Sequence, residues 1–131
     1  ILPANGPVVS RFGMRRHPIL RINKMHGGID ILVRTGSPVV STGDGVIREA
    51  GSGGAYGKYV RIEHPGTGYS TVYAHLSEIP KEIRSGRTVK RGETIGFSGN
   101  TGRSTGPHVH FEVHKNGHVV DPASYIRRTH R

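Results

Sequence analysis

The sequence has no cysteine or tryptophan, and only 6% of its residues are aromatic. Without cysteine the chain can form neither disulfides nor a thiolate metal site, which excludes a disulfide-stapled fold and cysteine-type zinc. An envelope protein and a cytosolic protein can both lack cysteine, so this absence does not fix the compartment. Because only 33% of the residues are hydrophobic, we expect a modest core of valine, isoleucine and leucine.

Long apolar runs are also missing. No stretch approaches the roughly 18 apolar residues of a membrane-spanning helix, so we expect no transmembrane segment in this chain. There is no signal peptide and no initiator methionine, and we expect a domain excised from a larger precursor. A length of 131 residues without linker or repeat predicts a single domain, with its core at about 8–125 and a basic tail at 126–131.

Acidic residues are scarce, since 9 stand against 19 lysines and arginines for a formal net charge of +10. The basic residues concentrate at 11–16, 81–91 and 127–131. Such a surface is either merely solvated or attracts a polyanion, such as nucleic acid, a membrane surface or an anionic cell-wall polymer. Aromatic residues do not alternate with the basic ones, as a single-strand stacking platform requires, so we do not expect a nucleic-acid partner.

Helical periodicity is nearly absent, and short β-branched runs bounded by Gly, Pro, Asn or Asp take its place. Strands are predicted at 28–33, 38–40, 45–50, 58–64, 69–75, 94–98, 108–114 and 118–120. Lys115, Asn116 and Gly117 join the last two strands and predict a β-hairpin. We therefore expect an all-β sheet or sandwich with few short helices, including a helical turn at 77–83 capped by Ser77.

Three local patterns involve histidine, of which the chain has nine. In the first, His26 and Asp30 enclose Gly27 and Gly28, and the two glycines favour a bend entering a strand over a helical turn. Asp30 is then expected near the start of the strand and His26 on the loop above it. Taken alone this pattern is weak, and a surface histidine followed by a turn aspartate is its more common explanation.

The second pattern is the pair His108 and His110 at the start of a predicted strand. Alternate residues of a strand point to one face, so both imidazoles project together while Val109 and Phe111 point the other way. Glu112 shares the histidine face and could hydrogen-bond the second nitrogen of a metal-bound histidine. A solvent-facing polar stripe would give the same alternation.

The third pattern is His75 at the end of the predicted strand 69–75. A period of two places His75 on the same face as Tyr69, Thr71 and Tyr73. His75 alone is uninformative, because most such histidines are structural or exposed.

Together these residues meet the needs of a catalytic zinc site, which takes three His or carboxylate ligands and leaves one position for water. Zinc lowers the pKa of water and polarises a carbonyl group, while neighbouring histidines can take a proton or support an oxyanion. This combination is suited to the hydrolysis of an amide. The helical H-E-x-x-H motif is absent, so the familiar helix-borne metalloprotease site does not apply.

The order H-x-x-x-D, then His75, then H-x-H resembles the LytM/lysostaphin-type M23 family of zinc metallopeptidases. Supporting segments lie at 10–13, 16–19, 43–47, 57–60, 73–76, 92–96, 99–112 and 120–122, so the resemblance covers about residues 8–125. It implies an antiparallel β fold with a narrow groove, one zinc ion at the groove floor and hydrolysis of peptides in bacterial peptidoglycan. The expected location is accordingly the periplasm or cell envelope.

Carried over by position, the resemblance makes His26, Asp30 and His110 the zinc ligands. His75 and His108 become the two catalytic histidines, and which of them is the general base stays open. All five positions are intact, which favours an active enzyme over a non-catalytic activator or wall-binding module of the same type.

The resemblance also bears on the substrate. Segment 16–19 is similar to members that cut between D-alanine and meso-diaminopimelate, so stem peptides and cross-bridges of that kind are expected. Glycyl-glycine bridges, which lysostaphin-like members cut, are the less favoured substrate. The net positive charge would aid docking on an anionic cell-wall surface.

The other five histidines are expected to have no role in the chemistry. His17 and His64 each precede a proline and are expected in turns, where His17 could border the groove. His114, His118 and His130 are expected at the surface.

Overall fold

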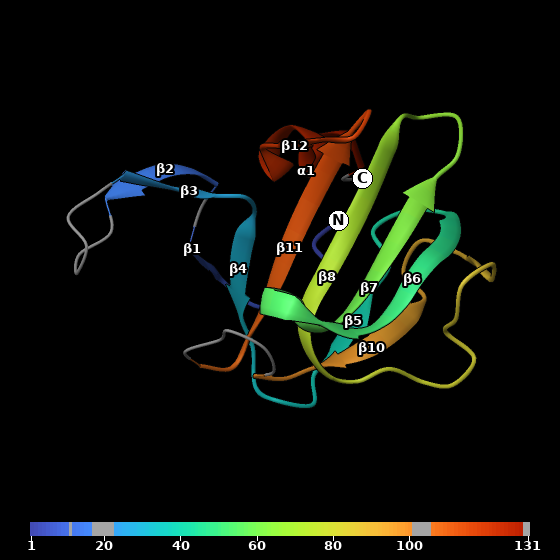
Figure 1. Cartoon of the computed structure of the whole chain (residues 1–131). Helices are drawn as coiled ribbons and strands as arrows, with labels where there is room; N and C mark the ends of the chain where they lie inside the picture. Colours follow the sequence, from blue (N-terminus) through green and yellow to red (C-terminus); the bar gives the residue numbers. More distant parts are fainter. Residues whose placement is uncertain (11, 17–22, 101–105, 130–131) are drawn as a thin grey trace.

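The computed structural model describes residues 1–10, 12–16, 23–100 and 106–129, and only the backbone of 10, 14–16, 23–26 and 127–129. Almost all of its regular secondary structure is β-strand (Figure 1). The strands are β1 (Val8–Ser10), β2 (Gly13–Arg16), β3 (Asn23–His26), β4 (Ile29–Leu32), β5 (Pro38–Val40), β6 (Gly45–Gly53), β7 (Gly57–His64), β8 (Tyr69–Glu78), β9 (Thr88–Val89), β10 (Thr94–Ser98), β11 (His108–Lys115) and β12 (His118–Val120). A 3-10 turn, η1 (Gly54–Tyr56), and a helix, α1 (Pro122–Thr129), complete the described elements.

Among the described residues, ten strands join one sheet, whose main path is β1-β4-β11-β8-β7-β6-β9. β12 pairs with β11, and β10 pairs with both β5 and β8. Strands β2 and β3 form a separate two-stranded ribbon that projects from the sheet at the left of Figure 1. Every pairing is antiparallel, so the expected all-β antiparallel fold is confirmed.

The core lies on one face of the sheet, and β11 shows how the sequence divides the two faces. Val109, Phe111 and Val113 are fully buried in the core, as their alternation predicts. The intervening residues His108, His110, Glu112 and His114 point to the opposite face, because successive side chains of a strand alternate. We call this second side of β11 and its neighbours the histidine face.

The predicted hairpin at the end of β11 is confirmed. Val113, His114 and Lys115 of β11 pair with Val120, Val119 and His118 of β12. The two-residue loop has φ values of 50° at Asn116 and 85° at Gly117. Both are left-handed, as the twist of a tight hairpin requires, and Asn-Gly is the residue pair best suited to that conformation.

All eight predicted strands are present, but some elements differ from expectation. The helical turn predicted at 77–83 is wrong, because β8 continues through Glu78, which pairs with Phe97 of β10. Pro80 follows, and the chain turns there through a hydrogen bond from the Ile83 amide to the Pro80 carbonyl oxygen. Helix α1 was not predicted, and it includes residues 126–129 of the expected basic tail.

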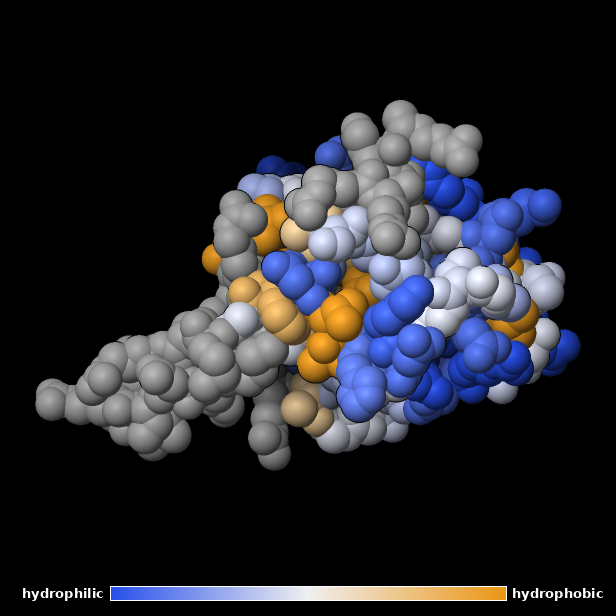
Figure 2. Space-filling view, turned by 90° about the horizontal axis from the view of Figure 1, so that it is seen from above, coloured by the Kyte–Doolittle hydropathy of each residue, from blue (hydrophilic) through white to orange (hydrophobic). Residues whose placement is uncertain are grey.

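Few of the described large hydrophobic side chains are exposed. Seen from above, most of the described surface is hydrophilic and an apolar patch lies near its middle (Figure 2). Of the large hydrophobic side chains that the structure describes, those exposed are Leu2, Val9, Leu32 and Val119. No helix in the described ranges has the length and apolar character needed to cross a membrane.

Candidate active site

Asp30 and His110 meet across two neighbouring strands. They are directly paired in the ladder between β4 and β11, so their side chains leave the sheet side by side. His110 Nδ1 lies 2.8 Å from Asp30 Oδ1, and the side chains are only 13% and 17% exposed. A predicted ligand pair 80 residues apart in sequence is thus brought into contact by strand register.

The glycines before Asp30 allow this close approach. A Cβ atom on Gly28 would collide with the Phe111 carbonyl oxygen of β11, whereas one on Gly27 would meet Glu112 and Val119 at an ordinary 3.7 Å. Glycine is therefore needed at position 28 because β11 passes directly against its backbone. The predicted glycine bend before the strand is consistent with this placement.

His108 and His75 lie beside this pair. His108 Nδ1 is 2.7 Å from the Gly106 carbonyl oxygen, and its Nε2 is 3.6 Å from Asp30 Oδ1. The carbonyl can only accept, so Nδ1 is the donor of this hydrogen bond and Nε2 is the nitrogen directed at the site. The His75 ring centre is 5.0 Å from that of His108 and 5.9 Å from that of His110.

The strand parity expected for His75 is wrong. Tyr73 and Thr71 hydrogen-bond each other on the core side, but His75 points to the histidine face. The reason is a backbone φ of 62° at His75, in the left-handed region that non-glycine residues seldom adopt. This local turn switches the side on which the next side chains lie, so Leu76 belongs to the core. Conformations of this kind are concentrated at functional sites.

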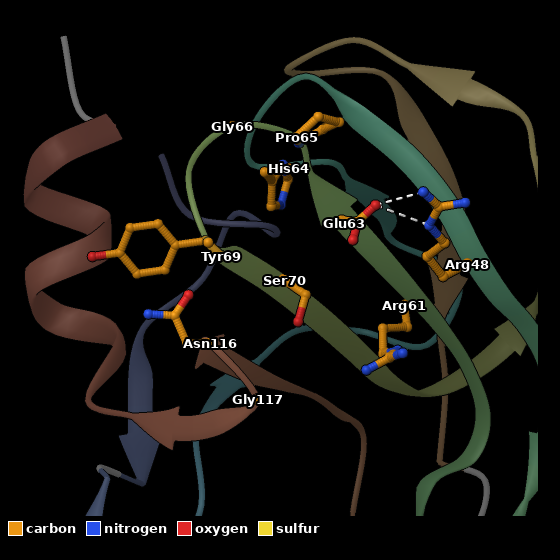
Figure 3. Close-up of a pocket in the computed structure, with 11 residues that line it drawn as sticks. Arg48, Arg61, Glu63, His64, Pro65, Gly66, Tyr69, Ser70, Asn116 and Gly117 are labelled. Carbon is orange, nitrogen blue, oxygen red and sulfur yellow. Dashed lines mark hydrogen bonds and ion pairs between the residues drawn. The ribbon is translucent and has the colours of Figure 1, made fainter.

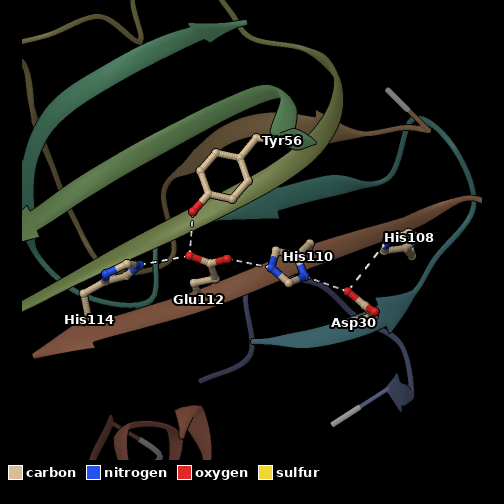
Figure 4. A network of polar contacts seen from close by, with 6 residues as sticks. All are labelled: Asp30, Tyr56, His108, His110, Glu112 and His114. Carbon is tan, nitrogen blue, oxygen red and sulfur yellow. Dashed lines mark hydrogen bonds and ion pairs between the residues drawn. The ribbon is translucent and has the colours of Figure 1, made fainter. Parts of the chain in front are cut away.

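Glu112 lies at the centre of a row of polar contacts (Figure 4). Its Oε2 accepts a hydrogen bond from His110 Nε2 at 2.8 Å. Its Oε1 accepts from His114 Nε2 at 2.9 Å and from the Tyr56 hydroxyl at 2.6 Å. The expected contact between Glu112 and the second nitrogen of His110 is present, while His114, expected to be solvated, belongs to the same row. Tyr56 was not predicted at all.

These contacts determine the protonation of the site. Burial disfavours the charged form of His110, but hydrogen bonds to Asp30 and Glu112 outweigh it and raise the pKa of His110 to about 9. Burial would likewise raise the pKa of Glu112, yet hydrogen bonds from His110, His114 and Tyr56 lower it to about 2. Glu112 is therefore a carboxylate at neutral pH. At neutral pH His110 accordingly carries both ring protons and donates from Nε2 to Glu112 and from Nδ1 to Asp30.

The donor set suits zinc, although one predicted ligand lies outside the described side chains. Asp30 offers oxygen and His110 offers nitrogen, which zinc accepts in catalytic sites. The loop position expected for His26 is wrong, because its backbone ends strand β3 and pairs with Gly13; its side chain is not described. Without it, the described side chains include no group of three or more His, Asp or Glu residues arranged to hold an ion.

Other histidines differ from one another in their surroundings. His64, expected in a turn, instead ends β7 and is only 5% exposed. Its Nδ1 donates to the Asp44 carbonyl oxygen at 2.8 Å, and its Nε2 lies 2.8 Å from Thr71 Oγ1. His118 is exposed, as expected. His17 and His130 lie outside the described residues.

A separate pocket of about 340 Å³ lies beside the start of β8, at Tyr69 and Ser70 (Figure 3). Arg48, Arg61, Glu63 and Ser70 are among its lining residues. Both arginines already have acidic partners, because Arg48 pairs with Glu63 and Arg61 with Glu49. The pocket therefore offers neither clustered imidazoles nor a clear excess of charge, and the histidine face is the better candidate for chemistry.

Comparison with known proteins agrees with this geometry. Residues 24–122 match Peptidase family M23. The DD-carboxypeptidase/endopeptidase Mpg of Neisseria meningitidis is 47% identical over 117 residues, which cover 89% of this chain and 26% of that protein. The chain spans about a quarter of the length of such curated relatives.

Solved structures give the same result. A zinc-containing peptidase from Vibrio cholerae superposes with a TM-score of 0.85 at 39% identity, covering 92% of this chain and 37% of that one. The catalytic domain of lysostaphin from Staphylococcus simulans superposes with a TM-score of 0.83 at 30% identity, covering 94% and 93%. The fold, the histidine face and these similarities lead to one conclusion: the chain belongs to peptidase family M23.

Proposed function

We propose that this chain is a zinc-dependent endopeptidase that hydrolyses peptide cross-links of bacterial peptidoglycan. The observation that carries the proposal is the direct pairing of Asp30 with His110, beside the rings of His75 and His108. Amide hydrolysis is well served by this partly buried group, in which a carboxylate and one imidazole can bind a metal and two further imidazoles lie beside them.

Asp30, His110 and His26 would hold one zinc ion. Zinc supplies a Lewis acid that activates water and polarises the scissile carbonyl group. Asp30 and His110 are supported in this role by their mutual contact and by the Glu112 carboxylate behind His110. His26 is supported by its place in the H-x-x-x-D motif, one short bend before β4.

His108 and His75 would handle protons and charge. His108 donates from Nδ1 to the Gly106 carbonyl oxygen, so its Nε2 is the nitrogen able to take a proton from the attacking water. We therefore assign His108 as the general base. His75, buried at 7% exposure with its ring against that of His108, would stabilise charge on the carbonyl oxygen or protonate the leaving amine.

Among wall peptides, we favour the bond between D-alanine and meso-diaminopimelate. Mpg is named a DD-carboxypeptidase/endopeptidase, and ShyA of Vibrio cholerae, 43% identical over 115 residues, is named a peptidoglycan DD-endopeptidase. The lysostaphin catalytic domain is more distant at 30% identity. The substrate of this chain would therefore follow its nearer relatives rather than the glycyl-glycine type.

Action on this substrate would place the chain outside the cytoplasm, in the periplasm or cell envelope. The net charge of +10 supports the same setting, because a cationic surface is attracted to anionic wall polymers. That attraction is screened by salt, so wall binding should weaken as ionic strength rises.

Digestion of purified diaminopimelate-type sacculi, followed by mass spectrometry of the products, tests the proposal. The chain should release uncross-linked stem peptides, a chelator should stop it, and added zinc should restore it. The His110→Ala variant is the matched inactive control. Binding to sacculi without any cleavage would instead identify a non-catalytic wall-binding or activator module.

A further inference from the structure

Glu112 has a partner that comes from a distant part of the chain. Tyr56 lies at the end of η1, at the tip of the hairpin between β6 and β7, and its hydroxyl donates to Glu112 Oε1 at 2.6 Å. Gly54 and Gly57, with φ values of 55° and 64°, let the hairpin turn at this point. The tip thus crosses the histidine face, and the Tyr56 ring centre lies 6.4 Å from that of His110.

The arrangement limits what the Glu112 carboxylate can do. Its oxygens receive three donors, from Tyr56, His114 and His110. Tyr56 and His114 both donate to Oε1, which leaves Oε2 directed at His110 Nε2. A buried carboxylate with fixed donors on one oxygen has little freedom to rotate.

A fixed carboxylate also fixes the imidazole beyond it. In the neutral ring that can bind a metal, Glu112 accepts the Nε2 proton, and it thereby selects the tautomer with an unprotonated Nδ1 and one orientation of the ring. In that orientation Nδ1 faces Asp30 at 2.8 Å. Without Glu112, the His110 ring could turn or exchange tautomers, and the geometry offered to a metal would be lost part of the time.

We propose that Glu112 is a positioning residue for His110, and that Tyr56 and His114 act through Glu112 to hold the metal-binding nitrogen in place. The inference rests on the proposed zinc site and deepens it by assigning roles to three residues that do not themselves bind the ion. The Tyr56 hairpin thereby becomes part of the metal site, although it lies 54 residues before His110 in the chain.

Zinc affinity, measured by competition with a chromophoric chelator, tests this inference. Tyr56→Phe removes one hydroxyl group and keeps the ring, and Glu112→Gln replaces the carboxylate that accepts all three hydrogen bonds with a neutral amide. Loss of an outer partner typically weakens metal binding by about 10–100-fold. We expect Glu112→Gln to fall in that range and Tyr56→Phe near its lower end, with turnover of both variants largely restored by excess zinc.

Tyr59→Phe is the matched control. Tyr59 lies on the same hairpin, 5.2 Å from Tyr56 between ring centres, but its hydroxyl donates to Glu49. This variant should bind zinc as tightly as the unmodified chain. In the cobalt-substituted protein, the visible spectrum of Tyr56→Phe should change and that of Tyr59→Phe should not.

Two results would overturn the inference, and a third would overturn the proposed function on which it rests. Unchanged zinc affinity in both Tyr56→Phe and Glu112→Gln would overturn it and leave the proposed function standing. Equal weakening by Tyr59→Phe would also overturn it, because hairpin stability would then explain the effect. If the unmodified chain bound no zinc, the proposed function itself would fail. Unfolding temperatures of the metal-free variants show whether each variant is folded. If Glu112→Gln does not fold, the comparison of Tyr56→Phe with Tyr59→Phe still tests the inference.

Discussion

Gly28 lies so close to the Phe111 carbonyl oxygen that no side chain fits between them. This contact joins the H-x-x-x-D segment to β11, the strand that carries His108 and His110. The glycine is therefore required by packing between two segments of the site.

Replacing Gly28 with alanine should consequently destabilise the protein, whereas the same change at Gly27 should not. Overpacking against a backbone atom typically costs about 1–3 kcal/mol, because one of the two segments must shift. Chemical unfolding of metal-free protein measures both variants. Equal stability of Gly28→Ala and Gly27→Ala would show that β4 and β11 are not packed as described.

The Tyr73 hydroxyl group is expected to contribute to the stability of the fold. It is fully buried and lies 3.2 Å from the Thr42 amide, 3.0 Å from Thr42 Oγ1 and 2.7 Å from Thr71 Oγ1. Tyr73→Phe leaves these groups short of a partner, and we expect a loss of about 1–3 kcal/mol in the free energy of unfolding.

The exposed hydroxyl of Tyr59 offers a comparison, since Tyr59→Phe should change stability by less than about 0.5 kcal/mol. Urea titration of both variants measures their free energies of unfolding. A Tyr73→Phe protein as stable as Tyr59→Phe would mean that the buried network contributes nothing.

His64 should make stability depend on pH. Burial lowers its pKa below the usual 6.5, and the hydrogen bond to the Asp44 carbonyl only partly opposes this. Between the folded and unfolded pKa values the unfolded chain binds a proton that the folded chain does not. Stability from this group is therefore complete above about pH 6.5 and declines as pH falls below it, by at most about 1.4 kcal/mol per pH unit.

Comparison with His64→Gln isolates this effect, because all other titrating groups are retained. The free energy of unfolding should fall less steeply between pH 7 and pH 5 in the variant than in the unmodified chain. Both are measured with chelator present, so that zinc release does not contribute. Parallel slopes would contradict the assignment of a lowered pKa to His64.

Much of the site could be predicted because its spacing is regular. The alternation along 108–114 separated Val109 and Phe111 from His108 and His110, and strand register then explains why Asp30 lies opposite His110. The hairpin at Asn116 and Gly117 could likewise be predicted, because few residue types other than Asn and Gly adopt the left-handed conformation that its loop requires.

Other features depend on contacts that a local pattern does not contain. His75 escapes the two-residue period because its backbone is left-handed, and tertiary packing rather than residue type imposes that conformation. Tyr56 meets Glu112 across 56 residues, and its only local sign was a tyrosine among glycines at a hairpin tip.

Helix α1 is a different case, because a signal for it was present. Asp121 Oδ1 accepts the Ala123 amide at 3.0 Å, and Pro122 occupies the first helical position. Aspartate followed by proline is a common helix start. Strands β2 and β3 carry mainly polar residues and so gave no apolar period to read.

Zinc content and peptidase turnover, measured on the same preparations of single variants, test the central claim most directly. His110→Ala should lose both zinc and activity. His75→Ala and His108→Ala should keep zinc while losing turnover by about 10²–10⁴-fold, and the exposed His118→Ala should change neither. Release of zinc by His75→Ala or His108→Ala, or a His110→Ala protein that still binds zinc and cuts sacculi, would contradict the account.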